Sequence, residues 1–237
     1  MRFIGVDLAW ATDTKHTGIA VMEGDAERVW LRCLSKGMRS LDAVASYVLG
    51  HTAPTTVVSI DASLIVRTRR GNERAISQTF GARGASCHST NRGRQHFDSG
   101  GRLVEKLGFA HFIPFEGPMR GGQWVIEVYP HPAMLRLFNL DWIIRYKKGK
   151  VAEKRGGLVE LQQRLKTLAC LEDSEALSTL LEQDPAARRG NSLKELEDLL
   201  DATFCAYLAW HNSRWGAERN DCFGDLEHGY IVVRRSA

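Results

Sequence analysis

The sequence predicts an α/β fold: a mixed sheet with an antiparallel first hairpin, then parallel strands, and helices on both faces. Three observations support this. Short apolar runs of strand length open the chain and recur as far as residue 129. The first runs are joined by short connections, whereas a segment with helical spacing precedes the fourth. Because a strand that returns through a crossover helix lies parallel to the first, pairing should change from antiparallel to parallel.

The first sixty residues supply the hairpin and the crossover. Three strand patterns open the chain, at residues 2–7, 17–22 and 28–34. The glycine-containing link at 23–27 has hairpin length. Residues 40–49 place apolar side chains at helical spacing, with Ser40 as the candidate N-cap, and Gly50 stops this helix. Residues 56–60 then form the fourth strand.

The rest of the chain contains an irregular segment and several helices. Residues 62–122 are rich in Gly, Arg, Ser and Asn, and such a long irregular stretch is usually functional or partly mobile. After it we expect a fifth strand at 124–129, a helical turn at 133–138, an exposed basic loop at 141–155, helices at 158–171, 174–183 and 192–212, and a last strand at 229–233; within it, short helices could occur at 73–80 and 100–106. We therefore expect one domain over residues 1–237, with an irregular basic segment at 62–122 and a helical insertion at about 141–190.

The composition is typical of a globular protein in a reducing compartment. Hydrophobic residues make up 43% of the 237 residues and charged residues 25%, and the formal net charge is +4. No apolar run approaches the roughly 20 residues that span a membrane, and no signal-peptide core is present. The five cysteines are scattered without a CxxC pair, which argues against a disulfide framework and a cysteine-rich zinc site. We expect a cytoplasmic protein with no membrane partner.

Acidic residues stand at unusual positions beside apolar segments. Asp7 and Asp61 end the first and fourth strands, Glu127 lies in the fifth, and Asp201 borders an uncharged part of the last helix, one turn after Asp198. An unpaired buried carboxylate is costly, so such groups neutralise, pair or hold a metal. Ligands bind at the edge that the carboxyl ends of parallel strands share, so we expect these acids to converge there.

Converging carboxylates suit Mg²⁺ or Mn²⁺ rather than zinc. We expect Asp7, Asp61, Glu127 and Asp201 to be catalytic and metal-binding, with Asp198 as a further metal ligand. Simpler roles stay open for four of these five acids. The strand-end aspartates could form turns or cap helices, Glu127 could form a structural ion pair, and Asp198 could be a solvated acid favoured by the helix dipole.

Five short motifs resemble a known protein family. They are Gly5-Val6-Asp7-Leu8-Ala9-Trp10, Ser59-Ile60-Asp61-Ala62, Glu127-Val128-Tyr129-Pro130, Asp198-Leu199-Leu200-Asp201-Ala202 and Gly229-Tyr230-Ile231. Their order resembles the ribonuclease H-like superfamily and, more narrowly, the family catalogued as domain of unknown function 429, described as predicted ribonuclease H-like nucleases. The resemblance implies a metal-dependent nuclease that hydrolyses phosphodiester bonds of DNA or RNA.

Basic residues suggest how an anionic substrate could be held. Between residues 64 and 122, ten Lys or Arg residues accompany four acids. This imbalance suits an anionic substrate, although a solvated Arg-rich surface would show the same pattern. The substrate-binding candidates are Arg69, Arg70, Arg83, Arg92, Arg94 and His131. The last, between two prolines after the fifth strand, could assist proton transfer or pack at a helix start.

Two other functions fit the same pattern. An actin-like or sugar-kinase-type phosphotransferase or ATPase also places an acid at the end of its first strand. However, the loop at residues 8–15 has no glycine for close approach to phosphates, and nucleotide binding would favour this class. A non-catalytic nucleic-acid-binding module on a degenerate nuclease fold is the third class, and it predicts that the acids do not bind Mg²⁺.

Overall fold

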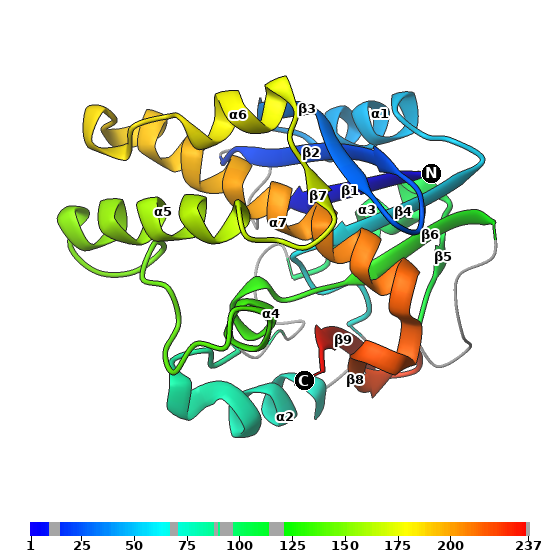
Figure 1. The fold of residues 1–237 in the computed structure, drawn as a ribbon. Coiled ribbons are helices and arrows are strands. Elements are labelled where there is room, and N and C mark those ends of the chain that lie inside the picture. The colour runs from blue at the N-terminus through cyan, green and yellow to red at the C-terminus, as the bar shows by residue number, and fades with distance from the viewer. Residues whose placement is uncertain (10–14, 67–70, 88–89, 91–96, 114–120, 236–237) are drawn as a thin grey trace.

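The computed structural model describes residues 1–9, 15–66, 71–87, 90, 97–113 and 121–235. Across these residues, the sheet strands are β1 (Arg2–Asp7), β2 (Thr17–Gly24), β3 (Val29–Met38), β4 (Thr55–Ile60), β5 (Ala110–His111), β6 (Gly122–Glu127) and β7 (Leu171–Glu172). They form a seven-stranded sheet in the order β5-β6-β4-β1-β2-β3-β7 (Figure 1). β2 is antiparallel to β1 and β3, whereas β1, β4, β6 and β5 run parallel. The predicted fold class is confirmed, and this order is consistent with the ribonuclease H-like fold.

The helices cover both faces of this sheet. They are α1 (Leu41–Gly50), α2 (Gly71–Phe80), α3 (Ser99–Leu107), α4 (Pro130–Leu137), α5 (Val151–Leu165), α6 (Glu175–Leu181) and α7 (Gly190–Arg219), with 3-10 turns η1 (Gly81–Arg83) and η3 (Pro185–Ala187). The long helix α7 crosses one face and contacts β1 to β4 (Figure 1). Helices α1 and α3 pack on the opposite face. A second small sheet pairs β8 (Asn220–Asp225) with β9 (Gly229–Arg234).

Alternation along β1 sends side chains to two separate cores. Phe3 belongs to the core that α7 covers, whereas Ile4 and Val6 belong to the core under α1 and α3. Gly5 faces α7, and a Cβ placed there would lie 2.0 Å from the carbonyl oxygen of Ala202. The absence of a side chain at this position therefore lets the backbone of α7 lie directly against β1.

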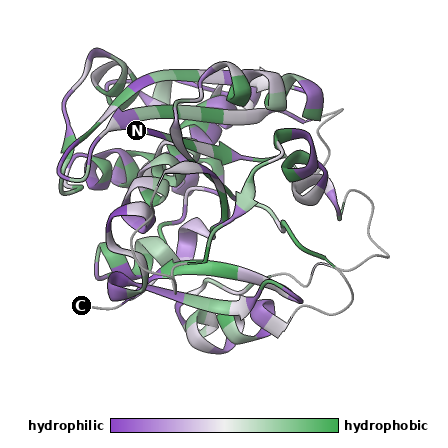
Figure 2. Cartoon of the chain, turned by 90° about the vertical axis from the view of Figure 1, so that its right-hand side faces the viewer, coloured by the Kyte–Doolittle hydropathy of each residue, from purple (hydrophilic) through white to green (hydrophobic). Residues whose placement is uncertain are grey.

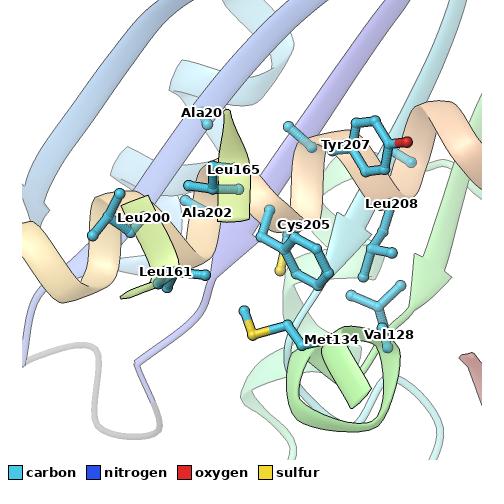
Figure 3. Close-up of a cluster of buried hydrophobic side chains, with 14 of the residues drawn as sticks. Ala20, Val128, Met134, Leu161, Leu165, Leu200, Ala202, Cys205, Tyr207 and Leu208 are labelled. Carbon is cyan, nitrogen blue, oxygen red and sulfur yellow. The ribbon is translucent and has the colours of Figure 1, made fainter. Parts of the chain in front are cut away.

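The core beneath α7 also receives the helices of residues 141–190. Figure 3 shows Leu161 and Leu165 of α5 in one apolar cluster with Leu200 and Ala202 of α7 and Met134 of α4. In Figure 2, hydrophobic residues fill long stretches of the strands, while the helices alternate between hydrophobic and hydrophilic residues. This alternation is typical of helices with one buried face. None of the described helices is both long and apolar enough to cross a membrane.

The structure corrects the prediction of an exposed basic loop at 141–155. Helix α5 already begins at Val151, where the backbone N–H of Lys150 donates to Oε2 of Glu153 at 2.7 Å. Tyr146 is fully buried although four basic residues surround it in the sequence. The prediction is wrong for residues 151–155, which are helical, and for Tyr146, whose side chain is buried and whose hydroxyl bonds to a buried carboxylate. Residues 141–150 do form a loop, in which Arg145, Lys148 and Lys150 are exposed.

Other differences concern short or extended elements. β5 and β7 have two residues each, too few to show a periodic pattern, and neither was predicted. The last helix continues beyond residue 212 to Arg219, with a kink at Gly216 (φ 46°, ψ −139°). β8 follows directly, so the predicted last strand has an antiparallel partner.

Candidate functional site

The carboxyl ends of β1 and β4 bring Asp7 and Asp61 together. The two strands are parallel neighbours, and the backbone N–H of Asp61 donates to the carbonyl oxygen of Val6 at 2.9 Å. Both side chains point to the face covered by α7. Side chains two residues apart on a strand share a face, and the positions two residues before Asp7 and Asp61 contact this helix. One such position is Ser59, whose hydroxyl donates to the carbonyl oxygen of Cys205. The predicted convergence of these two acids is therefore present.

Helix α7 adds Asp201 and Asp198 on the same side of the sheet. The Asp201 side chain is fully buried, and the hydroxyl of Tyr146 donates to its Oδ1 at 2.5 Å. Asp198, one turn earlier, is also buried and lies 2.5 Å from Nζ of Lys194. Burial, followed by the charge of Asp7, raises the pKa of Asp198 to about 8. This carboxyl therefore takes up a proton more readily than an exposed aspartate.

Lys147 stands among the three aspartates that converge. Its Nζ lies 3.6 Å from Oδ1 of Asp7 and 3.5 Å from Oδ2 of Asp61. It also contacts Oδ2 of Asp201 more closely. Burial opposes the charge of this ammonium, but Asp201 and Asp7 outweigh it and raise the pKa of Lys147 well above its ordinary value. With three carboxylates and one ammonium, the cluster carries a formal charge of −2 when fully ionised.

Two acids of this cluster, Asp61 and Asp201, hold protons more tightly than exposed aspartates. Burial raises the pKa of Asp61 to about 6, with Lys147 lowering it and Asp7 raising it. Burial likewise raises the pKa of Asp201 to about 7, against the lowering effect of Lys147. Negative charges at this distance repel each other and need a cation between them. The ammonium of Lys147 supplies that cation in this structure.

Glu127 lies at the same edge of the sheet as the aspartates, but its side chain is on the other face. It is the last residue of β6 and is in register with Ile60, one residue before Asp61. Ile60 packs into the core under α1 and α3, and Glu127, in register with it, takes the same face. Asp61 is one residue further along the chain, so its side chain points to the opposite face. The carboxylate of Glu127 accepts a hydrogen bond from the backbone N–H of Leu64 at 2.8 Å. Glu127 therefore approaches the aspartates from the opposite side.

A cavity of about 630 Å³ opens beside the cluster. Its size is within the range of sites that bind small molecules or parts of larger ones. Asp7, Asp61, Asp198 and Glu127 line it. Cationic or titratable basic side chains also line it, from elements far apart in the sequence: Lys15, His16, Arg39, Lys147, Lys148 and Lys194. The site thus combines a carboxylate cluster with surrounding positive charge, as an anionic substrate handled with a cation would require.

The structure describes two of the six predicted substrate-binding residues, Arg83 and His131. Arg69, Arg70, Arg92 and Arg94 lie outside the described residues. Arg83 is in η1, does not line the cavity, and donates from its guanidinium to the carbonyl oxygen of Leu140. It therefore supports the start of the segment that carries Lys147.

His131 does line the cavity, where α4 begins. It is 6% exposed, and its ring centroid is 5.2 Å from that of Tyr146. Burial, followed by the charge of Lys147, lowers the pKa of His131 to about 3. The imidazole is therefore neutral at pH 7, and within the described structure its Nδ1 is buried without a hydrogen-bond partner.

Sequence reasoning missed Tyr146, Lys147 and Lys194. The first two lie in a run that reads as a basic surface loop, and Lys194 reads as a helix-surface lysine. One signal was available: Lys194 is four residues before Asp198, a spacing at which opposite charges on a helix meet. No comparable local signal places Lys147 beside three acids that are distant in sequence.

The donor chemistry of the cluster fits Mg²⁺ or Mn²⁺, but its present spacing does not. Carboxylate oxygens are the ligands these ions prefer, and Mg²⁺ holds them at 2.0–2.1 Å. Here the oxygens of Asp7 and Asp61 lie 3.6 and 3.5 Å from the centre that Nζ of Lys147 marks. Accordingly, no group of three His, Cys, Asp or Glu residues in the described structure is arranged to hold a metal ion. Within the same residues, Oδ2 of Asp198 is buried without a hydrogen-bond partner.

The fold and the site define an α/β protein that gathers aspartates from two parallel strands and one helix at the edge of its sheet. The chain belongs to the family described as protein of unknown function (DUF429), whose sequence profile matches residues 5–225. The match includes all the residues of the aspartate cluster and Lys147. A search of curated proteins finds no match to the chain.

Proposed function

We propose that this protein is a nuclease that depends on a divalent metal ion and hydrolyses phosphodiester bonds of DNA or RNA. The observation that carries the proposal is the convergence of Asp7, Asp61 and Asp201 on one point beside a cavity. These side chains come from two parallel strands and one helix. Their arrangement agrees with the ribonuclease H-like order of the sheet.

The three aspartates would hold Mg²⁺ or Mn²⁺, with Asp198 and Glu127 as further acids of the same cavity. When bound, the ion supplies the charge that activates a water molecule and stabilises the leaving oxygen of a phosphodiester. Asp7 and Asp61 are partly exposed to the cavity, whereas Asp201 is fully buried and oriented by Tyr146. Tyr146 therefore fixes the direction of the Asp201 carboxylate toward the other two acids.

The basic side chains around the cavity would attract and orient the phosphates of the substrate. Lys15, Arg39 and Lys148 line the cavity. Cations around a recessed site raise the local concentration of an anionic substrate. His131 is neutral and able to accept a proton only at low pH, so its proposed part is to pack against Tyr146 rather than to act as a base near pH 7.

A second candidate function, a nucleic-acid-binding module without catalysis, is favoured by one observation. Lys147 already supplies a cation to the three aspartates, so part of their charge is compensated without metal. If Lys147 occupies this position permanently, the acids are structural and the surrounding positive charge serves binding alone. Metal binding in solution distinguishes the two functions.

The deciding experiment is a calorimetric titration with Mg²⁺ and with Mn²⁺. We expect saturable binding to the wild type and its loss in Asp7→Asn and in the Asp7→Asn/Asp201→Asn double variant. Asp42→Asn is the matched control, because Asp42 is a largely exposed acid in α1 that pairs with Lys106 at 2.6 Å. Thermal unfolding of each variant verifies that the fold is retained.

Cleavage of labelled single- and double-stranded DNA and RNA then tests the activity. We expect Mg²⁺-dependent cleavage by the wild type and by Asp42→Asn, and none by Asp7→Asn. Cleavage by Asp7→Asn at the wild-type rate would show that the aspartate cluster is not the catalytic site. Nucleic-acid binding without metal binding or cleavage would support the module instead.

A further inference from the structure

Lys147 has the position and the flexibility of a replaceable cation. Its Nζ is the point on which the oxygens of Asp7, Asp61 and Asp201 converge. The side chain is 25% exposed, in contrast to the fully buried carboxyl of Asp201 below it. Lys147 also lines the cavity of about 630 Å³, which gives its ammonium a path out of the cluster.

The neighbouring residues allow the side chain to move while the backbone stays in place. Tyr146 is fully buried, and its hydroxyl holds Oδ1 of Asp201 at 2.5 Å. Lys148, on the other side, is exposed and lines the cavity. A lysine ammonium is a compact charge on a flexible four-carbon stem, so rotation of the stem alone relocates it. The anchored tyrosine keeps the segment beside the acids in either position.

We propose that Lys147 is a built-in competitor of the divalent metal ion: it keeps the three aspartates assembled when no metal is bound and withdraws into the cavity when metal enters. This inference rests on the proposed metal site. The charges support an exchange of one cation for another. Without any cation, three carboxylates within this distance repel, and the cluster would spread apart. With both cations at one point, the ammonium and the metal ion would repel in turn.

Withdrawal would also place the ammonium of Lys147 in the cavity, beside Lys148 and within the region proposed for the substrate phosphates. The same side chain would then compensate the acids in the metal-free protein and contact the substrate in the loaded protein. Metal affinity is consequently lower than the carboxylates alone would give, because binding must displace an ion pair.

The test compares Mn²⁺ affinity in the wild type, Lys147→Met and Lys148→Met by calorimetry. The two variants remove the same charge from adjacent positions, but in the described structure Lys148 forms no ion pair with the acids. We expect Lys147→Met to bind at least about tenfold more tightly than the wild type, since charges this close interact strongly even in a partly polar environment. Lys148→Met should change the affinity by less than about threefold.

Lys147→Gln is a second variant in case Lys147→Met does not fold. Its side-chain amide can still donate a hydrogen bond to Asp201 but carries no charge. In chelator, both Lys147 variants should melt below the wild type, and Mn²⁺ should raise their melting temperature by more than it raises that of the wild type. A second measurement is acylation of lysines, followed by mass spectrometry. Labelling of Lys147 in the wild type should rise when Mg²⁺ is added, because the ammonium leaves its carboxylate partners.

The outcomes separate this inference from the proposed function. Equal Mn²⁺ affinity in wild type and both Lys147 variants would overturn the competition while leaving the metal site intact. Weaker binding by the Lys147 variants would also overturn it, because the lysine would then assist the metal. Failure of every protein to bind Mn²⁺ would overturn both the inference and the metal-dependent function.

Discussion

Replacement of Gly5 by alanine tests the contact that places α7 against β1. A Cβ at this position would lie 2.0 Å from the carbonyl oxygen of Ala202 and 2.2 Å from the backbone nitrogen of Ala206. Side-chain carbons are not found closer than about 3 Å to such atoms, so the helix or the strand must shift by about 1 Å. Both contacts are with the backbone of a helix packed across four strands, so rotation of a side chain cannot relieve them.

Overpacking of this kind destabilises proteins by about 1–3 kcal/mol and occasionally by more, and we expect Gly5→Ala to reach about 3 kcal/mol. For a chain of this length, each kcal/mol lowers the melting temperature by roughly 2–4 °C, so the expected decrease is roughly 6–12 °C. Thermal unfolding followed by circular dichroism measures it. Gly156→Ala in α5 is the matched control, because a Cβ there meets nothing within 4 Å and alanine favours the helix by about 0.5–1 kcal/mol.

A melting temperature of Gly5→Ala equal to that of the wild type would refute the close approach of α7 to β1. The same variant also probes the site, because α7 carries Asp201 and β1 carries Asp7. A shift of about 1 Å exceeds what a metal site tolerates. Folded Gly5→Ala should therefore bind Mn²⁺ more weakly than Gly156→Ala.

Two further predictions concern single side chains. Tyr146→Phe removes the hydrogen bond to Oδ1 of Asp201 and leaves that buried oxygen without its donor. We expect a loss of about 1–3 kcal/mol in urea unfolding, and unchanged stability would show that the bond is not formed. Burial, followed by the charge of Arg234, lowers the pKa of His211 from 6.5 to about 4, so the unfolded chain binds its proton at higher pH than the folded one. The stability from neutral His211 is therefore complete above pH 6.5 and falls by up to about 3 kcal/mol as the pH drops to 4. His211→Gln should lose less stability than the wild type between pH 6.5 and 4. An identical dependence of stability on pH in the two proteins would contradict the lowered pKa of His211.

The sequence was sufficient to predict that Asp7, Asp61 and Asp201 meet, because each has a local mark. Two end apolar strand patterns, and the third borders an uncharged helical stretch. The order of strands and one crossover helix then determine that the two strand ends are neighbours. These are local patterns and topology, which a single sequence displays.

The placement of Glu127 required information that local patterns do not contain. Its strand was predicted at 124–129 but runs from Gly122 to Glu127, in register with residues 55–60 of β4. An offset of one residue decides which face a side chain takes, and register depends on the pairing of strands far apart in sequence. The position of Lys147 could not be predicted for a related reason: its partners Asp7, Asp61 and Asp201 are distant from it in the sequence.

The adjacent residues Tyr146 and Lys147 hold the two oxygens of one carboxylate. Tyr146 donates to Oδ1 of Asp201, and Lys147 contacts Oδ2. A designer who transplants the aspartates of this site onto another scaffold would therefore need to move the segment before α5 with them. Two strands and a helix would reproduce the acids, but without this pair of residues the buried aspartate would lose its fixed orientation and, in the metal-free protein, its counter-charge.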